Sequence, residues 1–351
     1  MVDPTNTEFD ENGQDELYVH HSFRADKGQN PLRVDKFLHN FLPDTSRTRI
    51  QKAAEVGSIH VNGAPVKSNY KVKPDDVVAL VLEQPPREYE IVPEDLPLDE
   101  VYRDDHVLVI NKEVGMVCHP GYGNHSGTLV HALAFIADQL PSGSAHDRPG
   151  LVHRLDKNTS GIMVVAMSEL ALSHLAKQFF DRTTKREYVA IVWGNVENDE
   201  GVVEGHIGRS RRDRLQMEVY PDGSEGKHAI THYKVLQRFG YITVVSCRLE
   251  TGRTHQIRVH MKYLGHPLFN DERYGGDRIL KGTAFSKYKQ FIDNCFSACP
   301  RHALHAKSLG FKHPYTGEQL FFDSVIPEDM QSVIDKFATY TKTHAPLADE
   351  S

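Results

Sequence analysis

Residues 150–166 read GLVHRLDKNTSGIMVVA and place an unusually polar turn between two apolar segments. The apolar flanks predict a strand on each side, and a plain turn between them would need only one Gly or Asn. This turn instead carries Arg154 two residues before Asp156, with Thr159 and Ser160 just after it. A carboxylate held near cations stays ionised and can act as a nucleophile or a base. The alternative is a salt-bridged turn that has no chemical role.

A second polar cluster occupies residues 250–263, which read ETGRTHQIRVHMKY. Its pattern predicts a helix over 254–264 with Thr254 as the N-cap. His255 and Arg258 are three residues apart, so they are expected to share one helix face. Such a concentration of donors suits a polyanion or a buried carboxylate. A solvated surface helix is the alternative.

The composition is that of an ordinary globular protein with room for two domains. The chain has 351 residues and a formal net charge of −7, which argues against coating nucleic acid by bulk attraction but allows a local basic groove. Four cysteines imply no disulfide framework. Because no long apolar run and no secretory signal are visible, we expect a cytoplasmic protein without a membrane partner.

Residues 18–83 are expected to form a small α/β unit near the N-terminus. The apolar spacing predicts a helix over 32–42, and a second helix follows over 45–57, with Thr45 or Ser46 at its start and a Gly at its end. An Asn-Gly pair within residues 58–66 predicts a hairpin, and a closing strand follows it.

The second of these helices begins with cations, which oppose the helix macrodipole. A phosphate ligand explains such a placement, whereas a solvated charged helix is the alternative. We therefore expect this face to bind RNA through Arg47, Arg49 and Lys52.

The remaining boundaries follow from composition. Residues 1–17 are acidic and expected to be disordered, and residues 84–98 contain four prolines and read as a linker. Residues 99–335 alternate many strands with helices near 128–139, 169–180 and 254–264. This order favours an α+β fold over a doubly wound sheet. Residues 336–351 are expected to be a C-terminal tail.

Two motifs carry a resemblance to a known family: HRLDKNTSG, beginning at His153, and TGRTHQIRVHM, beginning at Thr251. They resemble the RluA-like pseudouridine synthases, which act on large-subunit ribosomal RNA. The segments RVDKFL and SRTRIQKAAEVGSIHVNG resemble the alpha-L RNA-binding module. The resemblance implies a mixed, largely antiparallel central sheet with flanking helices, and a small RNA-binding module in front of it.

The resemblance also implies roles for individual residues. Asp156 would be the catalytic residue, and Arg154 would fill the stack that the flipped uridine leaves. Tyr188 would pack on the uracil ring, and Arg258 would keep Asp156 ionised. Supporting and substrate-binding contacts are expected from His153, Thr159, Arg253, His255 and Gln256. A basic loop is expected to face RNA through Arg209, Arg211 and Arg212.

Isomerising uridine to pseudouridine involves no net redox change and no hydrolysis, so no cofactor and no metal are expected. RNA is the expected partner, most of all large-subunit ribosomal RNA, and the chain is expected to be a monomer. A synthase acting on transfer RNA, a non-catalytic ribosomal-RNA-binding assembly factor and a metal-dependent RNA hydrolase are the alternatives. One rival pattern is close to zinc-ligand spacing and consists of Cys295, Cys299, His302 and His305.

Overall fold

The computed structural model describes residues 18–42, 45–82, 91–120, 124–137, 140–141, 149–211, 213, 216–283 and 285–343. The chain divides into two compact units, Met1–Glu88 and Tyr89–Ser351, and this division falls inside the expected linker. The expected acidic tail lies outside the described residues, as does Arg212. No helix in the described ranges combines the length and the apolar character needed to cross a membrane.

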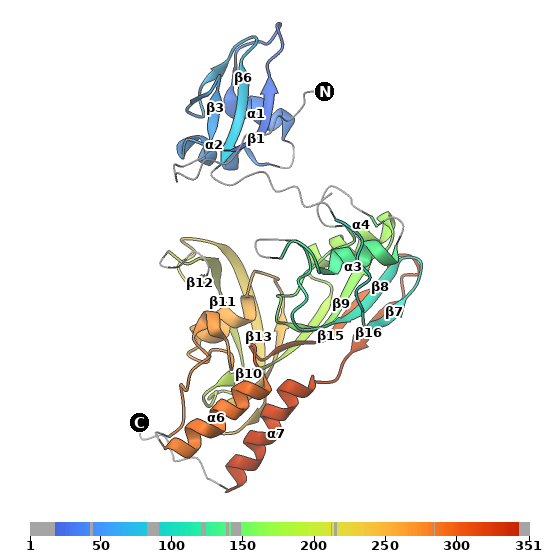
Figure 1. The fold of residues 1–351 in the computed structure, drawn as a ribbon, viewed down its shortest axis with the longest axis vertical. Coiled ribbons are helices and arrows are strands. Elements are labelled where there is room, and N and C mark those ends of the chain that lie inside the picture. Colours follow the sequence, from blue (N-terminus) through green and yellow to red (C-terminus); the bar gives the residue numbers. More distant parts are fainter. Residues whose placement is uncertain are drawn as a thin grey trace. The chain divides into compact units, whose positions relative to one another are not determined.

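The N-terminal unit packs two helices against small sheets (Figure 1). Its elements are β1 (Tyr18–Arg24), β2 (Leu32–Arg33), α1 (Val34–Phe41), α2 (Arg47–Glu55), β3 (Ile59–Val61), β4 (Ala64–Pro65), β5 (Lys71–Val72) and β6 (Val77–Leu82). One sheet has the order β1-β6-β3-β4, and β2 pairs with β5. The predicted order of helix, helix, hairpin and strand is confirmed, whereas β1 was not predicted.

Local sequence signals explain the turns of this unit. Asn62 and Gly63 both have positive φ angles, 49° and 83°, as a two-residue hairpin turn requires. Ser46 is the N-cap of α2, and its hydroxyl accepts a hydrogen bond from the backbone amide of Arg49. Gly57 ends the helix region with a φ of 79°, which a glycine adopts without a Cβ clash.

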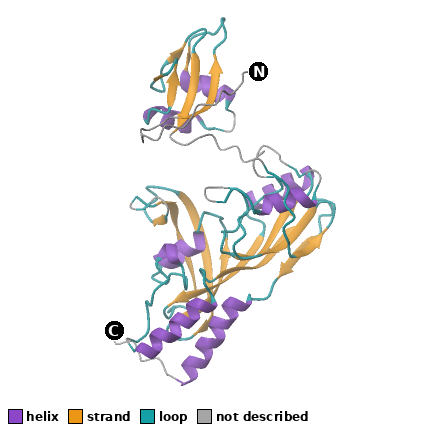
Figure 2. Cartoon of the chain, in the orientation of Figure 1, coloured by secondary structure: helices purple, strands orange, loops and turns teal. Residues whose placement is uncertain are grey.

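The second unit is built on one large sheet flanked by helices (Figure 2). Its strands are β7 (Glu100–Arg103), β8 (Val107–Lys112), β9 (Ser160–Ala166), β10 (Lys185–Trp193), β11 (Glu200–Arg209), β12 (Met217–Tyr220), β13 (Lys227–Arg238), β14 (Ile242–Leu249), β15 (Leu304–Lys312) and β16 (Gln319–Asp323). Its helices are α3 (Leu129–Ile136), α4 (Glu169–Phe180), α5 (Gln256–Tyr263), α6 (Ser286–Ala298) and α7 (Glu328–Thr343), with a 3-10 turn at Glu272–Tyr274.

Nine of the ten strands follow the order β12-β11-β13-β14-β10-β15-β9-β8-β7, and the tenth, β16, pairs with β15 beside this path. All pairs are antiparallel except β9 with β15, which are parallel. The expected α+β fold with a mixed, largely antiparallel sheet is therefore confirmed.

Several elements differ from the sequence prediction. The strands β7, β11, β12 and β15 and the helices α6 and α7 were not predicted. Helix α7 continues to Thr343, so the tail expected from residue 336 begins inside a helix. The apolar residues Met330, Val333, Ile334 and Phe337 of α7 are buried and have helical spacing. Burial of this apolar face explains why the segment is a helix and not a tail.

Candidate active site

The polar turn of residues 153–160 leads directly into the centre of the sheet. In the strand registers, Gly161 on β9 lies opposite Ala306 on β15, and Ala306 lies opposite Tyr188 on β10. Only a glycine fits at position 161, because a Cβ there would overlap the carbonyl oxygen of Ala306. Only β15 therefore separates β9, the strand that follows Asp156, from β10, the strand that carries Tyr188. The expected strand before the turn is reduced to a bridge between Leu151 and Val165.

Buried cations hold the backbone of this turn. Lys112 Nζ donates hydrogen bonds to the carbonyl oxygens of Glu113, Met116 and Lys157, at 2.7, 2.9 and 3.3 Å. Burial lowers the pKa of Lys112 to about 8.

Arg301 fastens the other end of the turn. Its Nη1 donates to the carbonyl oxygen of Asn158 at 3.1 Å, and its Nη2 donates to Ser160 Oγ at 3.3 Å. The same guanidinium holds both carboxylate oxygens of Asp329 on α7, at 2.7 and 3.0 Å. The turn, the start of β15 and helix α7 are therefore joined through one side chain.

The four residues with zinc-like spacing contact different parts of the protein and do not form one cluster. His302 Nε2 shares a hydrogen bond with Thr159 Oγ1 at 2.9 Å, and His305 Nδ1 shares one with Ser160 Oγ at 2.9 Å. Both cysteines of the pattern are buried in the core beside α6 and α7. Within the described ranges, no three His, Cys, Asp or Glu residues are grouped so that they could hold a metal ion. The two imidazoles instead hold the hydroxyl groups at the end of the polar turn of residues 153–160.

Asp156 faces Arg258. Arg258 Nη1 donates to Asp156 Oδ2 at 3.0 Å, and the Asp156 side chain is 23% exposed. Burial acts to raise the pKa of Asp156, but the charges of His255, when it is protonated at low pH, and of Arg258 outweigh burial and hold the pKa below its ordinary value. Burial lowers the pKa of His255 itself to about 4, so this imidazole is neutral at pH 7. Arg258 is therefore the cation that keeps Asp156 ionised near neutral pH.

A second carboxylate, Asp271, fixes Arg258 in place. Arg258 Nε and Nη2 donate to the two oxygens of Asp271 at 2.7 and 2.8 Å, and Asp271 is buried. The guanidinium lies 5.0 Å from the ring centroid of Tyr274, whose hydroxyl shares a 2.7 Å hydrogen bond with His255 Nδ1. The sequence interpretation missed Asp271 and Tyr274, because nothing in their local pattern separates them from a surface loop.

A cavity of about 590 Å³ opens over the carboxylate of Asp156. Asp156, Tyr188 and Arg258 line it together, as the resemblance implied. Tyr188 is mostly buried, and burial raises its pKa. Arg154 is exposed and also lines the cavity, and it makes no hydrogen bond or ion pair with any described residue. It is therefore available to a ligand.

Gln256, which was expected to contact the substrate, forms hydrogen bonds within the protein. The Gln256 side chain is buried, donates to Ile230 O and Thr231 Oγ1, and accepts from Thr251 Oγ1 and the Arg253 amide. All of its hydrogen-bonding capacity is used, so it has none left for a substrate, contrary to expectation.

His153 and Thr159 also differ from a simple substrate-contact role. His153 Nε2 accepts a hydrogen bond from the Val164 amide, and its ring stacks on Phe179 at 4.5 Å between centroids. Burial, and next the charge of Arg186, lower the pKa of His153 to about 3, so it is not a cation near Asp156. Both His153 and Thr159 line the cavity wall.

The start of α5 also differs from the prediction. His255, not Thr254, is the N-cap, with a left-handed φ of 56° and no side-chain cap. This conformation turns His255 toward the site, where its Nε2 lies 3.7 Å from Asp156 Oδ2. Arg253 is half-buried at the cavity wall and donates through Nε to the carbonyl oxygen of His228 at 3.0 Å.

The basic residues expected to bind RNA divide into two groups. Arg47 donates to the buried Asp35 at 2.9 Å, and the fold therefore has its own use for this cation, contrary to the sequence argument. Arg211 pairs with Glu225 at 2.7 Å. The remaining described residues of the set are exposed, and they are Arg49, Lys52 and Arg209.

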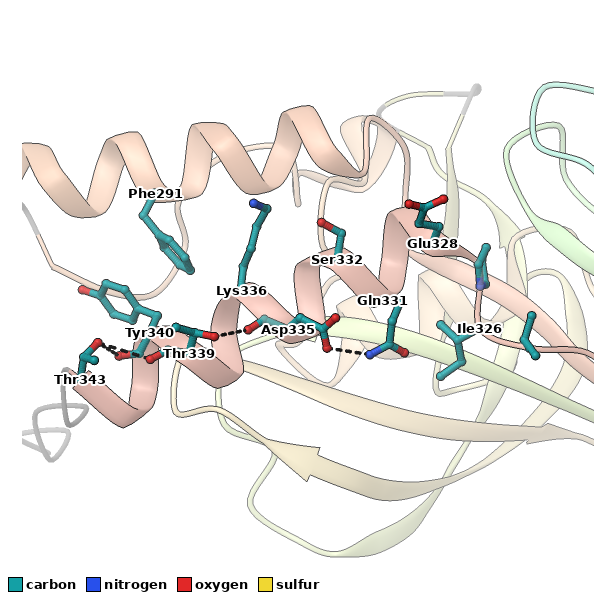
Figure 3. Close-up of a pocket in the computed structure, with 12 residues that line it drawn as sticks. Phe291, Ile326, Glu328, Gln331, Ser332, Asp335, Lys336, Thr339, Tyr340 and Thr343 are labelled. Carbon is teal, nitrogen blue, oxygen red and sulfur yellow. Dashed lines mark hydrogen bonds between the residues drawn. The ribbon is translucent and has the colours of Figure 1, made fainter.

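A second hollow, of about 930 Å³, runs along α7 and is far poorer in candidate chemistry (Figure 3). Phe291 of α6 stacks on Tyr340 of α7 at 4.4 Å between ring centroids. Gln331 donates to Asp335, so these polar groups along the helix bond to one another. None of the residues that bring Asp156 and Arg258 together lines this hollow.

Comparisons with known proteins agree with this geometry. Residues 106–263 match the family model of RNA pseudouridylate synthases, and residues 32–78 match the S4 domain. The chain is 45% identical over 318 residues to an uncharacterized RNA pseudouridine synthase of Chlorobaculum parvum, covering 89% of this chain and 96% of the relative. It is 41% identical over 303 residues to ribosomal large subunit pseudouridine synthase D of Nitrosomonas europaea, covering 86% of this chain and 83% of the relative.

A solved structure shares the fold. Human RNA pseudouridylate synthase domain containing 4 superposes with a TM-score of 0.50 at 23% identity, covering 68% of this chain and 92% of the human chain. The family model and the two relatives identify the chain as an isomerase that acts on RNA. The chain belongs to the RNA pseudouridine synthase family, and an S4 domain forms its N-terminal unit.

Proposed function

We propose that this protein isomerises specific uridines of large-subunit ribosomal RNA to pseudouridine, with Asp156 as the catalytic residue. Relatives named ribosomal large subunit pseudouridine synthase D support the substrate class. The observation that carries the proposal is the lone carboxylate of Asp156, held 3.0 Å from Arg258 and open to a cavity. No cofactor is needed, and the protein acts as a monomer in the cytoplasm.

The reaction exchanges one glycosidic bond for another. The bond between uracil N1 and ribose C1′ breaks, the base rotates, and a bond forms between C5 and C1′. The hydrogen on C5 is released as a proton, and N1 gains a proton, so atoms and electrons balance without an oxidant. An ionised carboxylate supplies the nucleophile or base that these steps require.

The target base reaches Asp156 by leaving its stack, which costs a few kcal/mol. Arg154 fills the vacated place, because a flat guanidinium stacks on bases and also holds a phosphate. Tyr188 packs on the uracil ring, and base–aromatic stacking of this kind contributes about 1–3 kcal/mol. The S4 domain adds affinity through exposed cations such as Arg49 and Lys52.

The test uses Asp156→Ala, with Asp277→Ala as a matched control because Asp277 is exposed and lies outside the cavity. Each protein is incubated with a large-subunit ribosomal RNA transcript and, separately, with transfer RNA, and pseudouridine is mapped by mass spectrometry. Wild type and control modify the ribosomal transcript, whereas Asp156→Ala binds it without modifying it. Normal modification by Asp156→Ala would refute the catalytic assignment. Modification of transfer RNA alone would refute the substrate assignment.

A further inference from the structure

Three arginines are buried among the described residues, and one of them has no partner there. Arg258 holds Asp271, and Arg301 holds Asp329, each through two hydrogen bonds. Arg186 is 8% exposed, forms no ion pair or hydrogen bond with a described residue, and has a fully buried Nε without a partner. A buried cation without a compensating charge is costly to the fold. We therefore expect a negatively charged ligand that pairs with Arg186.

The surroundings of Arg186 hold its guanidinium at the cavity without neutralising it. Its Cζ lies 5.4 Å from the ring centroid of Phe179, and Nη1 rests against Gly252, where a Cβ would lie 3.1 Å away. Both neighbours line the same cavity as Arg186 itself. The exposed Arg182 lines the cavity as well and adds a further cation to its lining. A site of this kind suits an anion.

We infer that Arg186 binds a backbone phosphate of the RNA strand, at the target nucleotide or its immediate neighbour. This inference rests on the proposed function for the nature of the strand. Arg186 precedes Tyr188 by two residues on β10, and both line the cavity. Two residues of a strand span about 6.5 Å, which is within the reach of one nucleotide from its base to an adjoining phosphate. The phosphate supplies the negative charge that the free protein lacks.

The test combines RNA affinity with the stability of the free protein. Arg186→Met keeps the apolar stem on Phe179 and removes the charge, whereas Arg186→Lys keeps the charge. Lys185→Met is the matched control, because Lys185 is the exposed preceding residue of the same strand and lies outside the cavity. Binding to a large-subunit ribosomal RNA transcript is measured over a series of salt concentrations for all four proteins, and their melting temperatures are recorded without RNA.

Arg186→Met is expected to weaken binding about tenfold or more, as the loss of a charged hydrogen bond does. The slope of log affinity against log salt becomes shallower by about 0.7–0.9, the value of one phosphate contact. Arg186→Lys retains the slope, and Lys185→Met changes neither quantity. The melting temperature of Arg186→Met stays level or rises, because an uncompensated buried charge is removed.

Three results would overturn the inference: an unchanged slope in Arg186→Met, an equal change in Lys185→Met, or a marked fall in melting temperature, which would make Arg186 a structural group. If inorganic phosphate raises the melting temperature of wild type but not of Arg186→Met while the RNA slope stays equal, the site takes a free anion and not RNA. Pseudouridine formation by wild type on the same transcript is scored separately. It tests the proposed function alone.

Discussion

The charge of Arg258 should set the lower pH limit of activity. Two unit charges about 4 Å apart interact by about 4 kcal/mol at an effective dielectric constant near 20, which corresponds to about 3 pH units. Arg258 also binds Asp271, and Asp156 is 23% exposed, so the acid limb is expected to move by less than this. The pKa of Asp156 lies below its ordinary value in the wild type, so activity is lost only when pH falls through that low value. Without the cation, burial dominates and raises the pKa, and the acid limb moves to higher pH.

The best variant for this purpose is the double substitution Arg258→Met with Asp271→Asn. Removing Arg258 alone would leave Asp271 buried and unpaired, which costs about 3–5 kcal/mol of stability. The assay follows tritium release from C5 of uridine in a ribosomal RNA transcript, as kcat/KM against pH. Asp271→Asn alone is the control and retains an acid limb at or below that of wild type. An acid limb in the double variant that coincides with the wild-type limb, whatever the loss of rate, would refute this reasoning.

Four further outcomes can be measured directly. Ser46→Ala should lower the free energy of unfolding of the S4 domain by about 0.5–1 kcal/mol in urea titrations, because the α2 cap is lost. Gly161→Ala should lower the melting temperature by about 5 °C or more, since its Cβ would overlap Ala306 and its φ is +122°. Burial opposes ionisation of Asp35, but hydrogen bonds from Gln51, Arg33 and Arg47 keep its pKa low. Circular dichroism should therefore show that the S4 domain loses stability as pH falls below about 4. Phe180→Ala should weaken RNA binding about fivefold or more at an unchanged melting temperature, because its ring is 85% exposed beside the cavity and free to stack on a base.

Local signals were enough to predict the parts of the fold that depend on neighbouring residues. The Asn62-Gly63 turn, an N-cap at Thr45 or Ser46 and helix α4 could be predicted from a few adjacent positions, and the structure places the cap at Ser46. Asp156 could be proposed for the same reason, since its turn is too polar for a link between two strands. The pairing of Asp156 with Arg258 came from the family resemblance and agrees with the geometry.

The remainder of the site depends on contacts between distant segments. Asp271 and Arg301 stand in unremarkable local sequence, and only the folded chain shows which charges they meet. Strand β15 was missed because it contains His305 and Ser308, whose polar groups conceal its central place in the sheet. Gln256 was assigned to the substrate for the converse reason, because its exposure could not be judged from its helix alone.

The bidentate pair between Arg301 and Asp329 has a consequence for how the protein is made. A ribosome synthesises the turn that carries Asp156 well before it reaches Asp329, which lies far downstream in the chain. Until α7 has emerged and docked, the guanidinium that grips Asn158 and Ser160 lacks its own anchor. Nascent chains should therefore remain catalytically silent while their RNA-binding domain is already folded, and a stop codon shortly before α7 should give a protein that still binds RNA but leaves its uridines unchanged.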